Sequence, residues 1–93
     1  MEVMAVIASI SAPMDCFYIP GKNQRIQVGF RQFDRNEPYL FLDFYDNDMH
    51  ILEDFTVNDA VKCQIGINFY DTGIGVTPFL TGYNLHHVVH KEA

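Results

Sequence analysis

Residues 39–55, which read YLFLDFYDNDMHILEDF, carry the pattern that decides the fold. The first seven side chains alternate between two sets, Leu40, Leu42 and Phe44 in one and Tyr39, Phe41, Asp43 and Tyr45 in the other. A period of two is typical of a strand with one buried face. We therefore expect a strand from Tyr39 to Tyr45, with the aliphatic set in the core and the rings of Tyr39, Phe41 and Tyr45 pointing away from it.

A short helix is predicted directly after this strand. Asp46-Asn47-Asp48 contains residue types that cap a helix N-terminus. One or two helical turns after them would turn Met49, Leu52 and Phe55 towards the interior. This is the one helix that the sequence predicts.

Four further strands are predicted on either side of this segment. Residues 3–10 form an apolar run that ends before Pro13, and residues 24–31 alternate between apolar and polar side chains. Asn58 lies in a turn and can adopt a left-handed conformation there. One face of the expected strand over 61–69 carries Val61, Cys63, Ile65, Ile67 and Phe69. One face of the expected strand over about 76–88 carries Phe79, Thr81, Tyr83 and Leu85.

Five strands with one helix between the third and the fourth are the succession of an OB-fold, a partly open five-stranded barrel. An SH3-like barrel or a split sandwich would have the same number of strands. The polar alternation of the second and fourth strands favours one curved sheet with a solvated face. With 93 residues in all, we expect an all-β OB-fold domain over residues 1–90 and a C-terminal tail over 91–93.

The composition predicts a folded protein of the cytoplasm. Hydrophobic residues make up 48% of the chain and charged ones 19%, which excludes the disordered class. No apolar run approaches the ~18 residues of a membrane span, and the first residues lack the basic region of a signal peptide. Cys16 and Cys63 are too few for a disulfide framework and fit no zinc pattern, so both are expected to be reduced thiols.

The charge is unevenly distributed along the chain. The net charge of −6 argues against simple electrostatic attraction to nucleic acid. However, Lys22, Arg25, Arg31 and Arg35 place four of the six basic residues within fourteen positions. Six of the twelve acids follow between residues 43 and 59. The sequence leaves open whether these acids lie against the basic strip and neutralise it.

Several segments resemble a small bacterial and phage OB-fold family of uncharacterised function that is similar to primosomal replication protein B and to single-stranded DNA-binding proteins. The resemblance rests on the opening Met1-Glu2-Val3, the Gly21-Lys22 loop, the strand over 39–45, the segment 55–61 and the hairpin around Asn68-Phe69-Tyr70. Asn58 stands where the family's turn has Gly. Asn68 and Tyr83 stand roughly where the family has an Arg and a Trp. The resemblance implies single-stranded DNA or RNA binding in replication or recombination, a homo-oligomer, and replication proteins as partners.

The residues themselves predict a binding face. Strands two and three of an OB barrel, with the loops after strands one and four, form its usual oligonucleotide surface. Aromatic rings stack bases there and cations contact phosphates. The candidates are Lys22, Arg25 and Arg31 for phosphate, and Phe17, Tyr18, Tyr39, Phe41 and Tyr45 for bases. The same aromatic face would also suit a protein–protein interface, because such interfaces are enriched in aromatics and Arg.

No catalytic function is predicted from the sequence. The chain contains no GxGxxG, Walker, HExxH or GxSxG motif, and its acid pairs have no nucleophile beside them. His86, His87 and His90 could place two metal ligands but not a third, so we expect no metal, no cofactor and a solvated tail. An acidic mimic of nucleic acid is a further hypothesis, supported by the net charge alone.

Overall fold

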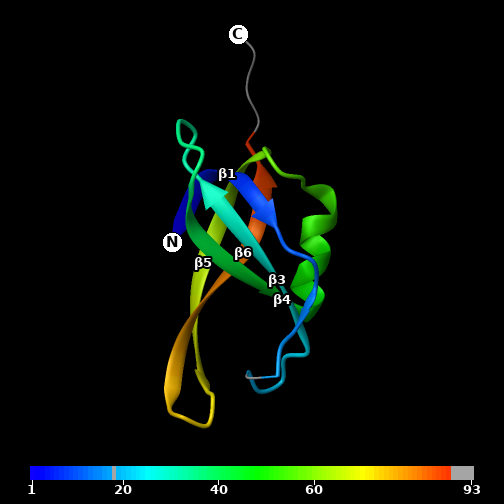
Figure 1. The fold of residues 1–93 in the computed structure, drawn as a ribbon, viewed down its shortest axis with the longest axis vertical. Helices are drawn as coiled ribbons and strands as arrows, with labels where there is room; N and C mark the ends of the chain where they lie inside the picture. The colour runs from blue at the N-terminus through cyan, green and yellow to red at the C-terminus, as the bar shows by residue number, and fades with distance from the viewer. Residues whose placement is uncertain (18, 89–93) are drawn as a thin grey trace.

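The structure is a computed structural model that describes residues 1–17 and 19–88. Six strands and a 3₁₀ helix follow one another along the chain (Figure 1). They are β1 (Glu2–Ile10), β2 (Met14–Asp15), β3 (Gln24–Arg31), β4 (Pro38–Tyr45), η1 (Asp46–Asp54), β5 (Ala60–Asp71) and β6 (Val76–His87). Since β2 is a two-residue strand in the expected loop, the five predicted strands correspond to β1, β3, β4, β5 and β6.

These five strands close into a barrel. Their order is β1-β5-β6-β4-β3, and an additional pairing of β1 with β3 joins the two ends. All pairings are antiparallel except that of β4 with β6, which are joined in parallel at Asp43 and Thr81. With η1 between the third and fourth barrel strands, the fold is an OB-fold-like barrel. The predicted fold class is therefore confirmed.

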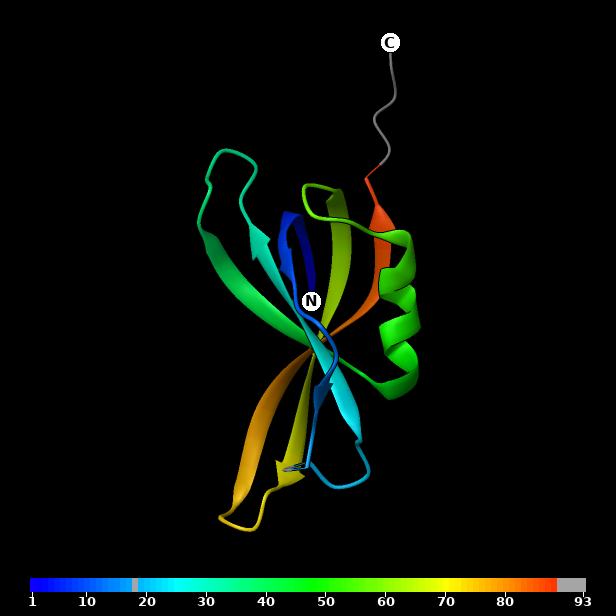
Figure 2. The same ribbon diagram turned by 45° about the vertical axis from the view of Figure 1, so that its right-hand side comes forward.

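The core is formed by the alternation seen in the sequence. Val28, Phe30, Leu42 and Phe44 are fully buried, because β3 and β4 turn every second side chain into the barrel. The helix η1 lies along one side of the barrel (Figure 2). Leu52 is buried at this position, as expected, together with Phe55 and the half-buried Met49.

The turn before β5 is fixed by Asp59. Asn58 has a φ of 79°, and the Asp59 carboxylate accepts a hydrogen bond from the Thr56 N–H at 2.9 Å. The Nε2 atom of His87 on β6 lies 3.2 Å from the same carboxylate. The Thr56 N–H, followed by His87, holds the pKa of Asp59 below its ordinary value. The backbone of the turn also bonds to Ile7 of β1. The turn is therefore tied to β1 by its backbone and to β6 by the Asp59 carboxylate.

We expect Asp59→Ala to lower the melting temperature at pH 7. Because the folded pKa of Asp59 lies below its ordinary value of 3.8, the carboxylate stabilises the protein above that pH, and this contribution is lost as the pH falls through the folded pKa. Melting curves of wild type and variant should therefore begin to converge as the pH falls below about 3.8 and should meet below the lower, folded pKa. Asp54→Ala removes an exposed carboxylate at the end of η1 as the control. A gap between wild type and Asp59→Ala that stayed constant into acid would contradict this role.

The β5–β6 hairpin differs from the expectation in two ways. It extends beyond the barrel, so Ile67 and Phe69 on the expected core face of β5 are exposed. The β5–β6 pairing shifts where Lys62 pairs with His86 but Gln64 pairs with Tyr83, so β6 has an extra residue beside Asn84, whose φ is 50°. This irregularity turns Leu85 into the core. The expectation that Leu85 shares a face with Thr81 and Tyr83 is therefore wrong.

The predicted cap and tail also need correction. Asp46, with a φ of 46°, does not cap η1; the residue at the cap position is Tyr45, which makes no side-chain cap bond. His86 and His87 belong to β6, and the His87 ring stacks on Phe55 with centroids 4.3 Å apart. His90 and the predicted tail over 91–93 lie outside the described residues.

Two further observations concern the chain's chemistry. Cys16 and Cys63 are both buried and free, and burial raises the pKa of the Cys63 thiol to about 11.

Within residues 1–17 and 19–88, no helical segment has the length and hydropathy needed to cross a bilayer.

Candidate nucleic-acid interface

The connection between β1 and β3 folds back against the outer side of the β5–β6 hairpin. Cys16 and Ile19 from this connection bury Tyr45 at the end of β4, and Tyr70 and Phe79 from the hairpin pack against the same cluster. Only 4% of Tyr45 is exposed. The prediction that Tyr45 offers an open ring is therefore wrong, because a segment more than twenty residues away in the sequence covers it.

Beside this cluster lies a hollow of about 370 Å³, which we call the outer hollow. Its walls come from the β1–β3 connection, β4, η1 and both strands of the hairpin. The residues lining it are Lys22, Asp43, Tyr45, Asp48, Gly66, Asn68, Tyr70, Thr81, Gly82 and Tyr83. Lys22 places its Nζ 5.7 Å from the centre of the Tyr45 ring, a distance typical of a cation–π contact. The outer hollow therefore combines one cation with three tyrosines.

Arg25, the next predicted cation, is engaged by an acid. Its Nη1 lies 2.9 Å from Oδ1 of Asp43, and the other oxygen of that carboxylate accepts the Tyr45 hydroxyl at 3.1 Å. The acidic segment thus does reach the basic strip at this point. Because this ion pair offsets the guanidinium charge of Arg25, Lys22 is better placed than Arg25 to bind an anionic ligand.

Two exposed rings continue from the outer hollow along β4. Phe41 and Tyr39 are 47% and 50% exposed, as predicted. Alternate residues of a regular strand lie about 7 Å apart on one face, so Phe41 follows Asp43 at that spacing. Tyr39 comes next, where the β3–β4 pairing shifts between Phe30 and Arg31. Gly29 on β3 pairs with Phe41, and a Cβ at Gly29 would stand only 3.0 Å from the Phe41 ring. The missing side chain lets this ring lie close to the sheet.

The structure does not bring Arg31 to the other predicted cations. Arg31 lies at the opposite end of β3 from Arg25, and its Nη1 donates to the carbonyls of Gln32, Phe33 and Arg35. It therefore holds the β3–β4 connection, while Arg35 lines a small hollow beside Tyr39. Of the two aromatics predicted in the first loop, Phe17 is 89% exposed and Tyr18 lies outside the described residues.

Sequence reasoning missed the contribution of the hairpin. Tyr83, 40% exposed, lies over Gly66, where a Cβ would stand 3.3 Å from its ring. Asn68 donates from Nδ2 to the Thr81 hydroxyl at 3.1 Å. The general role of the loop after the fourth OB strand in oligonucleotide binding was the available signal for these residues. It was missed because the sequence placed Tyr83 on the same face as Leu85, which lies in the core.

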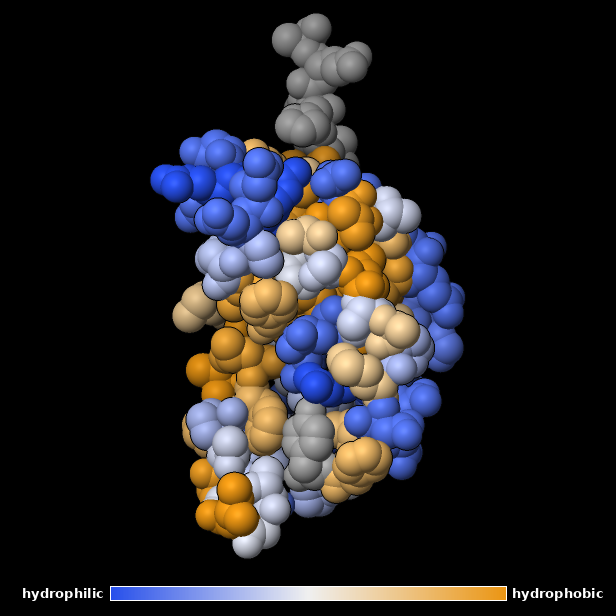
Figure 3. Space-filling model, viewed as in Figure 1, coloured by the Kyte–Doolittle hydropathy of each residue, from blue (hydrophilic) through white to orange (hydrophobic). Residues whose placement is uncertain are grey.

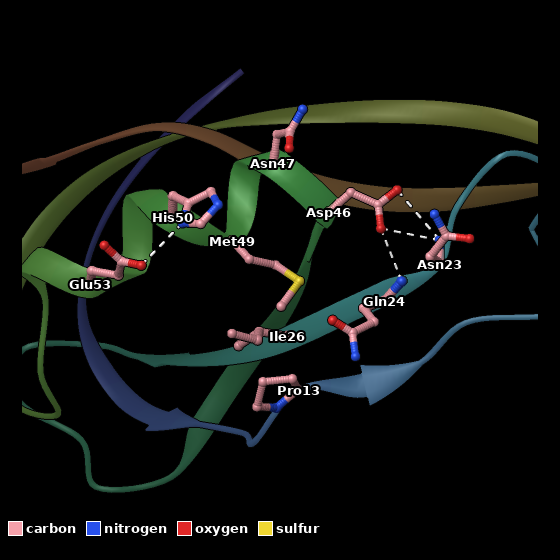
Figure 4. Close-up of a pocket in the computed structure, with 9 residues that line it drawn as sticks. All are labelled: Pro13, Asn23, Gln24, Ile26, Asp46, Asn47, Met49, His50 and Glu53. Carbon is pink, nitrogen blue, oxygen red and sulfur yellow. Dashed lines mark hydrogen bonds and ion pairs between the residues drawn. The ribbon is translucent and has the colours of Figure 1, made fainter.

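A second, larger hollow of about 640 Å³ lies between η1 and the start of β3 (Figure 4). Asp46 lies at one end of it and accepts the backbone N–H groups of Asn23 and Gln24 at 3.1 and 3.0 Å, which lower its pKa. His50 and Glu53 pair with each other on η1 at 3.0 Å. Asp46 thus joins η1 to the end of the β1–β3 connection, while His50 and Glu53 pair within η1. No cluster of three or more metal-binding side chains occurs in the part of the chain that the structure describes.

Comparison of the chain with protein-family models, with curated proteins and with solved structures found no significant match. The features that bear on function are therefore the outer hollow and the exposed rings of Phe41 and Tyr39 on β4.

Proposed function

We propose that this protein binds single-stranded DNA with little sequence preference, in bacterial or phage replication or recombination. The observation that carries the proposal is the outer hollow, where the partly open ring of Tyr83 and the cation of Lys22 line one cavity of about 370 Å³. Phe41 and Tyr39 extend this surface along β4. The protein is a binding protein in this account, not an enzyme.

Physical reasons support a single strand as the ligand. Aromatic rings accept the face of any base and contribute ~1–3 kcal/mol per stacked base, so binding tolerates sequence. The surface lies over the strands and between the two loops that OB-folds use for oligonucleotides. Lys22 next to Tyr45 can contact a phosphate while the neighbouring rings hold bases.

The small number of available cations predicts weak, salt-dependent binding. For single strands, each neutralised phosphate contributes about −0.7 to the slope of log K against log salt. With the one such contact that Lys22 supplies, a fourfold rise in salt should weaken binding by about two- to threefold. A fluorescence-anisotropy titration of labelled oligo-dT at two salt concentrations measures this change. Absence of binding at low salt rejects the proposal.

Two substitutions test the outer hollow. Lys22→Gln should weaken binding and reduce the magnitude of the salt slope by about 0.7, because one phosphate contact is lost. Tyr83→Ser should weaken binding by about tenfold at every salt concentration, because it removes a stacking ring. Val57→Ser is the control. Val57 is an exposed apolar residue in the turn between η1 and β5, and the variant should bind as wild type does.

A protein ligand on the same aromatic face is the second candidate. The observation that favours it is the acidic content of the outer hollow, where Asp43 offsets Arg25 and Asp48 also lines the cavity. The two candidates differ in the titration. If oligo-dT does not bind at low salt, the single-strand proposal is rejected and a protein ligand is the candidate that remains.

A further inference from the structure

The projecting part of the β5–β6 hairpin has an apolar face that the outer hollow does not use. Directly paired residues of an antiparallel ladder point to the same side. The pairs are Ile65 with Gly82, Ile67 with Leu80, Phe69 with Pro78 and Asp71 with Val76. We call the apolar residues of this side, Ile65, Ile67, Phe69, Val76, Pro78 and Leu80, the hairpin face. The opposite side carries Asn68 and Tyr70 of the candidate interface.

The hairpin face is exposed over a large area. Phe69 is 67% exposed and Val76 70%, and Figure 3 shows apolar atoms along the left-hand edge of the molecule, over this hairpin and at its tip. With ~150–250 Å² for a large side chain and exposed fractions of 41–70% for Ile67, Phe69, Val76 and Leu80, the exposed apolar surface is on the order of 500 Å². That is towards the upper end of the ~300–600 Å² found for the largest patch of a typical monomer, and it supplies more than half of the ~800 Å² that each partner buries in a standard interface.

The projecting hairpin also lacks support from the rest of the sheet. Among the described strands, β1 pairs with β5 only as far as Gln64, and β4 meets β6 only at Thr81. An isolated two-stranded hairpin is at best marginally stable in water. On its other side the hairpin packs through Tyr70 and Phe79 against the β1–β3 connection, so a partner that covers the hairpin face would support the side that is still open.

The face contains both a cavity and a side chain suited to fill one. Met1, Leu40, Ile65, Ile67 and Leu80 enclose an apolar hollow of about 490 Å³, which we call the hairpin hollow. Phe69 projects from the same face, about 7 Å along β5 from Ile67. A two-fold axis brings the same patch of both subunits together, so that each residue meets its counterpart reciprocally. Phe69 of each chain can then enter the hairpin hollow of the other.

The charge distribution favours a second copy of this chain over other partners. Between residues 63 and 85 the sequence contains one charged residue, Asp71. Elsewhere, a chain of net charge −6 would bring like charges together on self-association. The hairpin side carries a single charge at its outer end, Asp71 opposite Val76, so the apolar part of the face meets little of this repulsion.

We propose that two copies of this chain form a two-fold dimer through their hairpin faces, with Phe69 of each chain filling the hairpin hollow of the other. The opposite side of each hairpin, with Asn68 and Tyr83, stays open in this dimer. The proposal is independent of DNA binding.

The mass of the full chain in solution tests the dimer. Sedimentation equilibrium from about 1 to 100 µM should give the mass of two chains at the upper concentrations. Phe69→Thr, which keeps a residue suited to a strand, should raise the dimer dissociation constant at least about tenfold. Ile67→Thr, in the wall of the hairpin hollow, should have the same effect. Phe33→Thr in the β3–β4 connection, 53% exposed in the wild type, is the matched control and should remain dimeric.

Two results would overturn the proposal. One is a wild-type protein that has the mass of one chain at about 100 µM. The other is a dimer dissociation constant that stays at the wild-type value in both single variants, Phe69→Thr and Ile67→Thr. Circular dichroism of each variant shows whether the barrel is intact, and since both side chains are exposed, folded variants are expected.

Discussion

Phe44→Ala is expected to lower the free energy of unfolding by about 3–5 kcal/mol. Phe44 lies on β4 at the centre of the barrel and has no exposed surface. Its neighbours in the core belong to strands that the barrel closure holds in place, so they can collapse only partly into the space left by the ring. Both the lost burial and the remaining cavity therefore contribute to the loss.

Urea unfolding followed by circular dichroism measures this change. Phe33→Ala is the control, because the same truncation at a half-exposed position of a loop should cost well under about 1 kcal/mol. Phe44→Leu keeps most of the apolar volume and should cost less than Phe44→Ala. Equal losses for Phe44→Ala and Phe33→Ala would show that Phe44 is not in the core.

Gly82→Ala is expected to cost about 1–3 kcal/mol of folding free energy, although it adds a single methyl group. Gly82 lies on β6 with its missing side chain directed at the Phe44 ring, and a Cβ there would overlap two atoms of that ring and stand 3.1 Å from a third. The ring is fully buried and has little room to move. Glycine at this position is therefore required by the core and not by backbone conformation.

A double-mutant cycle separates this clash from other effects. Leucine at position 44 removes the outer part of the ring, so Gly82→Ala should cost less in the Phe44→Leu background than in wild type. Gly66→Ala on β5 is the control, since a Cβ there would meet Thr81 and Tyr83 at 3.2 and 3.3 Å, contacts that a side chain nearer the surface can relieve. Additive losses from Gly82→Ala and Phe44→Leu would contradict the contact.

The sequence predicts the barrel well because its strands are half buried. Ile26, Val28 and Phe30 alternate cleanly with polar neighbours, and the pleat turns them all to one side. The same rule fails for Tyr45, because alternation tells which side of a sheet a residue occupies but not what covers that side. Burial of Tyr45 depends on Cys16 and Ile19, whose approach is a tertiary contact with no local pattern.

The candidate site is less predictable than the fold. Arg31 and Lys22 are close in sequence, yet they lie towards opposite ends of β3, and each meets a different set of partners. Tyr83 was assigned to the wrong set of neighbours because the shift beside Asn84 breaks the period of two in β6. A single irregular residue thus decides which side chains reach the outer hollow.

The central claim is that the outer hollow and the β4 rings hold a single strand. Amide chemical shifts of the ¹⁵N-labelled protein during titration with oligo-dT test it most directly. Binding at this surface predicts changes at Lys22, Phe41, Asn68 and Tyr83, with Ile67 and Leu80 of the hairpin face unaffected. Saturating changes confined to the hairpin face, or no changes at low salt, would contradict the claim.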